Sequence, residues 1–161
     1  RYEVIGWRAF RGRPPLRVGR GIPDAEWFSS VPLLLVDRRG EGVEELIDKV
    51  ETAVRSYPHA EDYSTWPGPN SNTFTAYIGR QVPELGLDLP PTAIGKDYLP
   101  EGALFGRPPG GRGFQVSLYG VAGVLMGLEE GFEINLFGLV IGLDLNPPAL
   151  KLPGLGRLGW N

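Results

Sequence analysis

The sequence is organised around the stretch Trp66-Pro67-Gly68-Pro69-Asn70-Ser71-Asn72-Thr73-Phe74. Two prolines and a glycine indicate a turn-rich loop, and the small polar residues that follow are typical of the start of a helix. A hydroxyl at a helix start lies beside unpaired backbone N–H groups, at the positive end of the helix dipole. Ser71 therefore occupies a position that suits a nucleophile, and that suits an ordinary N-cap equally well.

Two helices are predicted on either side of this loop. Over residues 43–57, apolar side chains recur at three- and four-residue steps while acidic side chains occupy the opposite side, which predicts an amphipathic helix that Pro58 ends. A second helix is predicted from residue 71 or 72 to 81, before Pro83. Residues 84–113 are rich in glycine and proline without a period, so we expect irregular structure there.

The N-terminal region predicts strands separated by a basic loop. Residues 2–7 are rich in β-forming residues, and the continuous apolar run 31–36 suits a buried strand. Between them, residues 8–21 combine five arginines with glycine and proline, which indicates an exposed loop. Such a loop is either a solvated connection or a contact for an anionic partner such as a lipid headgroup.

The C-terminal region is apolar and regularly interrupted by glycine. Residues 114–120 alternate like a strand, and the apolar runs 121–128 and 132–145 are separated by Glu129-Glu130-Gly131, which we interpret as a hairpin turn. Neither run reaches the length of a membrane span. We expect two or three antiparallel strands over 114–152. A sheet with so many apolar residues must be covered on both faces, or must meet a membrane surface or a partner protein.

Length and composition limit the classes of function. A chain of 161 residues is most simply one domain, 1–161, with a helix-bearing part (1–113) and a β-rich part (114–161). The net charge of −3 lacks the basic footprint of a nucleic-acid partner. The chain has no cysteine and one histidine, which excludes a thiolate zinc site, a histidine-rich metal site and a cysteine nucleophile within it. We expect an α+β domain without a metal or cofactor.

The candidate catalytic residues are few. A serine hydroxyl is a weak nucleophile and needs a general base, usually an imidazole oriented by a third group. Within the chain that imidazole is His59, twelve residues before Ser71, which would reach it only if the loop folds back. Asn70 and Asn72 either cap the helix or orient a substrate, and Trp66 is a further candidate for substrate binding. Asp97 beside Lys96 could serve as a general base, but the pair is more simply a surface ion pair.

Several motifs together resemble the bacterial domain-of-unknown-function family DUF3750. They are the Trp66–Phe74 stretch, Arg80-Gln81-Val82-Pro83-Glu84-Leu85 and Leu89-Pro90-Pro91-Thr92-Ala93-Ile94-Gly95-Lys96-Asp97. The resemblance also takes in Tyr2–Trp7, 127–131 and 150–154, and so covers nearly all of the chain. The family has no established activity. Its members often look membrane-anchored through an N-terminal segment, which implies a bacterial cell-envelope location.

A more distant resemblance implies a mechanism. Asn70-Ser71-Asn72-Thr73-Phe74 is similar to the Asn-Cys-Asn-x-Phe motif of circularly permuted papain-like hydrolases, in which the cysteine opens a helix and the histidine lies on an earlier strand. The resemblance implies a permuted papain-like architecture, with Ser71 in the place of the cysteine and Glu3 as a possible orienting group. Members of DUF3750 carry a His-x-Trp strand just before the segment that begins this chain. That histidine is absent from these 161 residues, which open at Arg1 without a methionine, so we expect part of a longer protein.

Two functional hypotheses follow. The first is a hydrolase or an acyltransferase or amidase-like enzyme that acts on cell-envelope material, with Ser71 in the nucleophile position. The second is a non-catalytic structural or binding module, at a membrane surface or as a subunit of a larger complex. Whether the chain is an enzyme stays open on the sequence.

Overall fold

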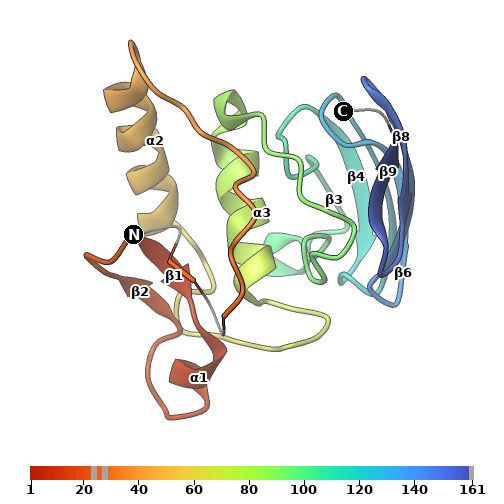
Figure 1. Ribbon diagram of the computed structural model, residues 1–161. Coiled ribbons are helices and arrows are strands. Elements are labelled where there is room, and N and C mark those ends of the chain that lie inside the picture. Colours follow the sequence, from red (N-terminus) through yellow and green to blue (C-terminus); the bar gives the residue numbers. More distant parts are fainter. Residues whose placement is uncertain (23–24, 27–28, 160–161) are drawn as a thin grey trace.

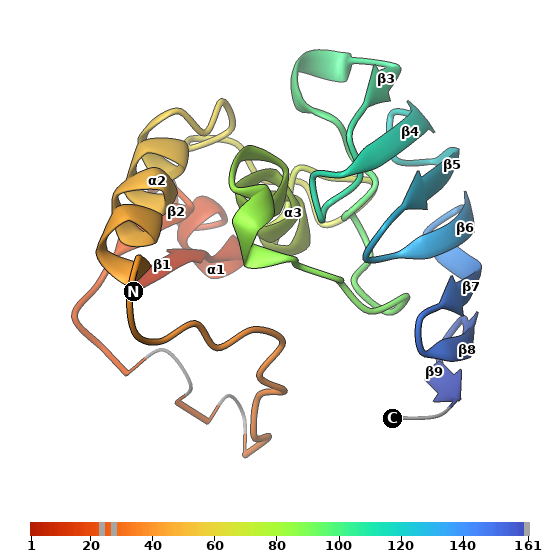
Figure 2. The same ribbon diagram turned by 90° about the horizontal axis from the view of Figure 1, so that it is seen from above.

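The computed structural model describes residues 1–22, 25–26 and 29–159. Helices and a small two-stranded sheet lie on one side, and a seven-stranded antiparallel sheet lies on the other (Figure 1). This arrangement confirms the predicted α+β class, a mostly antiparallel sheet with two packed helices. The helical layer comes from the first half of the chain and the large sheet from the second half (Figure 2).

Both predicted long helices are present. Helix α2 (Val43–Arg55) has acidic residues in its first turn and a basic residue in its last, which complements the helix dipole. Helix α3 (Ser71–Gln81) begins at the cap Asn70 and packs against α2 and the N-terminal strand. The facing side chains form the apolar core of this layer, which contains Val4, Ala53, Val54, Tyr57, Phe74, Tyr77, Ile78 and Val82.

The N-terminal region differs from its prediction. Strand β1 (Tyr2–Val4) is shorter than the predicted strand 2–7, and the chain then turns through the short helix α1 (Gly6–Ala9). The predicted loop 8–21 contains a second strand, β2 (Leu16–Val18), which pairs antiparallel with β1. Glycine and arginine dominate the composition of that loop and conceal the short apolar–polar alternation of β2 within it.

The apolar run 31–36 is not a buried strand, contrary to the prediction. It has no strand structure and crosses the helical layer as an extended segment, with Leu33 79% exposed and Val36 packed against the buried apolar cluster that contains Ala76 (Figure 1). A strand needs a neighbouring backbone for its hydrogen bonds. No strand of the described residues pairs with this segment, so its apolar composition alone does not produce one.

The large sheet contains more strands than predicted. Its order follows the sequence and every pairing is antiparallel: β3 (Phe105–Gly106), β4 (Gly113–Leu118), β5 (Ala122–Gly127), β6 (Gly131–Leu136), β7 (Leu139–Leu145), β8 (Pro148–Leu152) and β9 (Gly156–Gly159). Five of these, β4 to β8, lie in the region where two or three were expected. The difference arises because the glycine-spaced breaks within the apolar runs are tight turns. The Glu129-Glu130 turn is where the sequence predicted it.

The two faces of this sheet have opposite character. Side chains directly opposite each other on neighbouring strands share a face. The register therefore gives an inner row, toward the helices, of Gln115, Leu125, Glu133, Gly142, Lys151 and Arg157. We call the opposite side the outer face. It consists of Phe105, Phe114, Val116, Leu118, Ala122, Val124, Met126, Phe132, Ile134, Leu136, Leu139, Ile141, Leu143, Leu145, Pro148, Leu150, Leu152 and Leu158.

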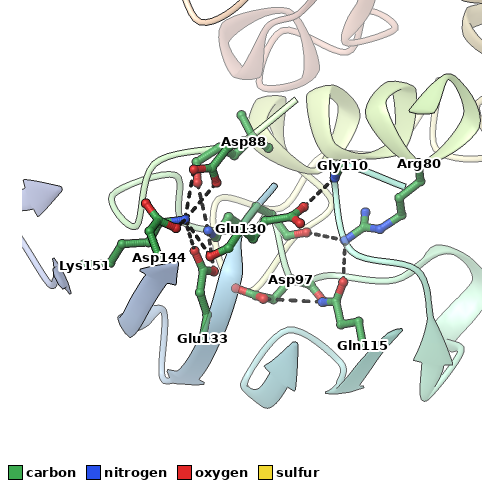
Figure 3. A network of polar contacts seen from close by, with 11 residues as sticks. Arg80, Asp88, Asp97, Gly110, Gln115, Glu130, Glu133, Asp144 and Lys151 are labelled. Carbon is green, nitrogen blue, oxygen red and sulfur yellow. Dashed lines mark hydrogen bonds and ion pairs between the residues drawn. The ribbon is translucent and has the colours of Figure 1, made fainter. Parts of the chain in front are cut away.

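Buried ion pairs join the inner face of the sheet to the loop that follows α3 (Figure 3). Glu133 lies between two ammonium groups, with Lys96 Nζ 2.6 Å from one carboxylate oxygen and Lys151 Nζ 2.9 Å from the other. Lys151 also lies 2.9 Å from Asp88 and 3.1 Å from Asp144. Although burial opposes the charge of Lys151, the carboxylates of Glu133 and Asp88 outweigh it and raise its pKa.

The pair Lys96-Asp97 is not at the surface, contrary to the prediction. Lys96 is fully buried and Asp97 is 5% exposed, because the loop that carries them lies between α3 and the sheet. Arg80, at the end of α3, donates to the Lys96 carbonyl (2.6 Å) and to Gln115 Oε1 (3.0 Å). Gln115 donates in turn to the Asp97 carbonyl (3.1 Å). Burial lowers the pKa of Arg80 to about 10, so it stays charged at neutral pH.

Candidate functional site

Asn70 fixes the start of α3. Its Oδ1 accepts hydrogen bonds from the backbone N–H groups of Asn72 (2.9 Å) and Thr73 (3.1 Å), which completes a capping box. Its Nδ2 donates to the carbonyls of Thr65 and Ile94, both at 3.0 Å. The side chain is 5% exposed and its hydrogen-bonding atoms are engaged within the chain. Asn70 therefore anchors the helix to two loops.

The residues after Ser71 make similar anchoring contacts. Asn72 Nδ2 donates to the Ile94 carbonyl (2.9 Å), and Thr73 Oγ1 donates to the Gly95 carbonyl (2.8 Å). Gly95 has φ +97°, and a Cβ atom there would lie 2.4 Å from Asn70 Nδ2, so this close approach requires glycine. The polar residues that flank Ser71 thus hold the helix start against the loop at 94–95.

Ser71 differs from its neighbours. Its side chain is exposed, and among the described residues its hydroxyl has no hydrogen-bond partner, whereas its carbonyl accepts from Thr75 Oγ1 (3.1 Å). It is the first residue of α3, beside the positive end of the helix dipole. The motif therefore presents one free hydroxyl on a rigid helix start.

Ser71 and Glu3 line the same groove, which has a volume of about 710 Å³. Strand β1 forms one wall and the first turn of α3 forms the other, and Tyr63 and Thr65 contribute from the loop between the helices. The Glu3 carboxylate forms an ion pair with Arg1, and its side chain is 14% exposed. The structure thus brings together the predicted nucleophile position and the predicted orienting carboxylate.

A second, apolar hollow of about 470 Å³ adjoins this groove. The two share Tyr2, Phe74 and Thr75 in their walls. The second hollow continues between the helices and the extended segment 33–36. Together the two hollows have a polar end at Ser71 and an apolar part that extends along the helical layer.

His59 and Trp66 are not among the residues that line either hollow. The His59 ring packs edge-on against Tyr57 and Tyr98, at centroid distances of 5.8 and 5.7 Å. Its Nδ1 lies 3.8 Å from an Asp62 carboxylate oxygen. Trp66 is 46% exposed and lies near the turn between β6 and β7. Neither side chain faces Ser71 across the groove.

The buried carboxylates form the other polar cluster of the molecule. Burial raises the pKa of Glu130 to about 7 and that of Asp97 to about 6. These groups are enclosed between the sheet and the loop after α3 (Figure 3). Within the described ranges, no cluster of histidine, cysteine and carboxylate side chains is suited to hold a metal ion. Because Lys96 and Lys151 neutralise Glu133, and lysine and arginine also pair with Asp88 and Asp144, we assign the cluster to structure.

Sequence reasoning missed several features of this site. Arg1, Tyr63 and Thr65 line the groove, yet nothing in their local sequence distinguishes them from loop residues. The buried charges did leave a signal, because Glu133, Asn135, Asp144 and Lys151 fall at alternating positions within apolar strands. That alternation indicates a polar inner face.

Comparison with known proteins gives one match. No curated protein sequence and no solved structure matches this chain. Within the described residues, no helix is both long and apolar enough to cross a lipid bilayer. The sequence model of one family, described as a protein of unknown function (DUF3750), matches residues 1–98, which include both long helices, the Asn70–Phe74 motif and the groove. The chain therefore belongs to the DUF3750 family.

Proposed function

We propose that the groove at the start of α3 binds an acyl or amide compound and cleaves or transfers its acyl group, with Ser71 as the nucleophile, in a permuted papain-like arrangement. The observation that carries this proposal is the free Ser71 hydroxyl. Its flanking polar residues are engaged in anchoring, whereas Ser71 opens into a groove that it shares with Glu3. A rigid helix start is a favourable support for a nucleophile, because it holds the attacking atom in place.

The proposed reaction is nucleophilic acyl transfer. Ser71 Oγ attacks the carbonyl carbon of the substrate, and its proton passes to a base as the new C–O bond forms. The ester C–O or amide C–N bond of the substrate then breaks, and the alcohol or amine leaves after the protonated base returns the proton to it. The acceptor then takes the acyl group from the serine, and water as the acceptor gives hydrolysis. The positive end of the α3 dipole stabilises negative charge on the carbonyl oxygen.

The proposed general base is not one of the described residues that line the groove. Glu3, which lines the groove, is a much weaker base than an imidazole, and its ion pair with Arg1 suits an orienting role better. The resemblance implies a histidine on a strand that precedes residue 1. Strand β1 has one strand partner, β2, among the described residues, so a further strand beside β1 would place such a histidine near the groove.

The adjoining hollow suggests the substrate class. Its walls are apolar, with Val54, Phe74, Ile78 and Leu87 among them, so it suits an extended hydrocarbon chain. A substrate with its carbonyl at Ser71 and an aliphatic chain along the helices would fill both hollows. We therefore favour an acyl ester or amide with an apolar chain, such as a cell-envelope lipid or lipid-modified molecule.

A serine-reactive probe tests this proposal in the full-length protein. A fluorophosphonate with a long alkyl chain should label the wild-type protein and fail on Ser71→Ala. Ser56→Ala is the matched control, because that hydroxyl bonds within the end of α2, outside the groove, and labelling should persist. Leu34→Glu should reduce labelling by long-chain probes more than by short ones, since Leu34 lines the apolar hollow. Absence of labelling in the folded wild-type protein would contradict the enzyme proposal.

A second candidate function has its own supporting observation. The outer face of the large sheet is apolar and exposed, which suits a non-catalytic binding module, at a membrane surface or in a larger complex, whose face is covered by another surface. The two functions separate by mutation. Ser71→Ala removes the first and leaves the second, whereas a charge on the outer face does the reverse.

A further inference from the structure

The outer face of the seven-stranded sheet is the largest feature of the molecule that the groove does not use. Most of its large side chains are between 37% (Val124) and 79% (Leu145) exposed, Val116 and Leu152 are half-buried, and none of its members is charged or polar. The register aligns them in continuous rows, for example Val116, Val124, Ile134 and Ile141 across four strands. No described helix or loop lies over this face (Figure 2).

The inner face fixes which side of the sheet is exposed. The ion pairs of Glu133 with Lys96 and Lys151 hold the inward-facing positions of β6 and β8 against the loop that follows α3. A shift of one residue in register would bury the apolar rows and expose these charges, at the cost of every buried ion pair. The apolar rows therefore point outward as a consequence of the whole polar network.

The area of this face exceeds what a monomeric soluble protein normally exposes. The largest of these side chains bury about 150–250 Å² each when they lie in a core. At about half exposure, each large side chain of the face therefore presents roughly 80 Å² to solvent. The face then offers on the order of 1,000 Å² of apolar surface, against about 300–600 Å² for the largest patch of a typical monomer. Another surface must cover it.

We propose that the outer face is the interface of a homodimer in which two copies pack sheet against sheet. The proposal rests on the second candidate function above and is independent of chemistry at Ser71. Stable interfaces bury about 800 Å² per partner, and obligate homodimers bury more, so the available area is sufficient. The face offers no side-chain hydrogen-bond donor or acceptor, so its partner must be equally apolar. A second copy of the same face meets that requirement.

The geometry of the sheet also suits a two-fold axis. Strand β6 is the central strand of the seven, and Ile134 is the middle outward residue of that strand. An axis near Ile134 would bring the same rows of both copies into contact, as an isologous interface requires. Two such sheets pack about 10 Å apart with their side chains interdigitated, which forms a β-sandwich core between the subunits.

The charges around the sheet favour a second copy over a lipid surface. Residues 105–159 carry four basic and four acidic side chains, so the region has no net positive charge. Arg112 is paired with Glu129, and Arg157 is paired with Asp144. A surface that lies on an anionic membrane usually combines its apolar face with a cluster of lysine or arginine, and the sheet region lacks such a cluster.

A pair of matched substitutions tests the proposal. Ile134 is 48% exposed on the outer face, and Ile47 is 51% exposed on α2, far from the sheet. Sedimentation velocity of the full chain should show a dimer from low micromolar concentration upward. Ile134→Glu should weaken the dimer by roughly 100-fold or more, because it buries two carboxylates at the centre of the interface. Ile47→Glu should leave the dimer unchanged.

Single cysteines give a second measurement that does not depend on a charge. The chain has no cysteine, so Ile134→Cys and Ile47→Cys each create one unique thiol. A short bis-maleimide should join two copies through residue 134 and not through residue 47. Failure of the 134 thiol to cross-link, or survival of the dimer in Ile134→Glu, would overturn the homodimer.

Flotation with vesicles of phosphatidylcholine and phosphatidylglycerol tests a lipid surface as the alternative partner. Flotation of a monomeric wild-type protein with the vesicles, lost in Ile134→Glu, would overturn the homodimer and retain the binding module with lipid as its partner. A wild-type protein that stays monomeric and does not float would contradict both the homodimer and a lipid-bound module. A wild-type dimer with no flotation supports the proposal.

Discussion

At the scale of single residues, the Asn70–Thr73 motif divides into anchoring residues and one free residue. Asn70 and Thr73 use their side chains to hold the helix start to the loop at 94–95. Ser71 makes no such contact and faces the groove. The resemblance to a catalytic motif and the capping interpretation are therefore compatible, because they concern different residues of the same turn.

Replacement of Asn70 measures the anchoring role. Asn70→Ala should lower the free energy of unfolding by about 2–4 kcal/mol, because it removes an N-cap, leaves the Thr65 carbonyl without its donor and removes one of the two donors to the Ile94 carbonyl. Asn72→Ala removes one hydrogen bond from an exposed position and should cost less than about 1 kcal/mol. Urea denaturation at fixed protein concentration measures both. Equal effects of the two substitutions would contradict the anchoring role of the Asn70 side chain.

At the scale of elements, α3 packs against its surroundings so closely that one position excludes a side chain. A Cβ atom at Gly79 would lie 2.2 Å from the Pro109 carbonyl oxygen and 3.0 Å from Leu87 Cδ2. The loop between β3 and β4 is therefore in contact with the helix backbone. Gly79 lies inside a helix because of this contact, against its helix propensity.

Gly79→Ala tests this close packing. Alanine favours a helix over glycine by about 1 kcal/mol, yet overpacking costs about 1–3 kcal/mol, so we expect a net loss of stability. Gln81→Ala, at an exposed position of the same helix, should change stability by less than about 0.5 kcal/mol. Thermal unfolding followed by circular dichroism compares the two variants. A stabilised Gly79→Ala protein would show that α3 and the loop at Pro109 are not in contact.

At the scale of the whole molecule, polar interactions join the helical layer to the large sheet. Apolar residues form the core between α2, α3 and β1, whereas ion pairs and hydrogen bonds occupy the space between α3 and the sheet. Buried ion pairs of this kind add little net stability but make one arrangement of the layers strongly preferred, because a displaced partner leaves an unpaired buried charge. The sheet is thus held in one register, with its apolar face outward.

The pH dependence of stability should report on this buried layer. Burial raises the pKa of Glu130 from 4.5 to about 7 in the folded protein, although Lys96 opposes the shift. The folded state therefore holds a proton that the unfolded state has lost, so stability falls as the pH rises from about 4.5 through 7. Residue 130 cannot ionise in Glu130→Gln. That variant should therefore lack this decrease in the free energy of unfolding, which is on the order of 3 kcal/mol between about pH 4.5 and 7.

Urea titrations at several pH values, at one protein concentration, measure this difference. The relevant quantity is the difference in slope between the wild-type protein and Glu130→Gln, because other carboxylates contribute equally to both. Glu84→Gln is the control, since Glu84 is an exposed partner of Lys49 and the substitution should preserve the wild-type slope between pH 4.5 and 7. Identical slopes for the wild-type protein and Glu130→Gln would mean that Glu130 is not buried as a protonated acid.

Much of the fold follows from local patterns. The helices α2 and α3 were predictable because their period, their terminal prolines and the cap Asn70 all act within a few residues. Strand β2 and the extended segment 31–36 were not, because strand formation depends on a partner elsewhere in the chain. The same limit applies to the number of strands in the large sheet, where glycine turns and apolar strands share one composition.

The sequence by itself determined the class of fold, the start of α3 and the position of Ser71 on it. Short-range hydrogen bonds and helical periodicity control these features. Only the tertiary structure decided that Ser71 and Glu3 share a groove, that His59 lies elsewhere and that Lys96 is buried. It also decided that the apolar side of the sheet faces outward. Each of these features depends on contacts between segments far apart in the chain. The energies of such contacts cannot be derived from the local sequence.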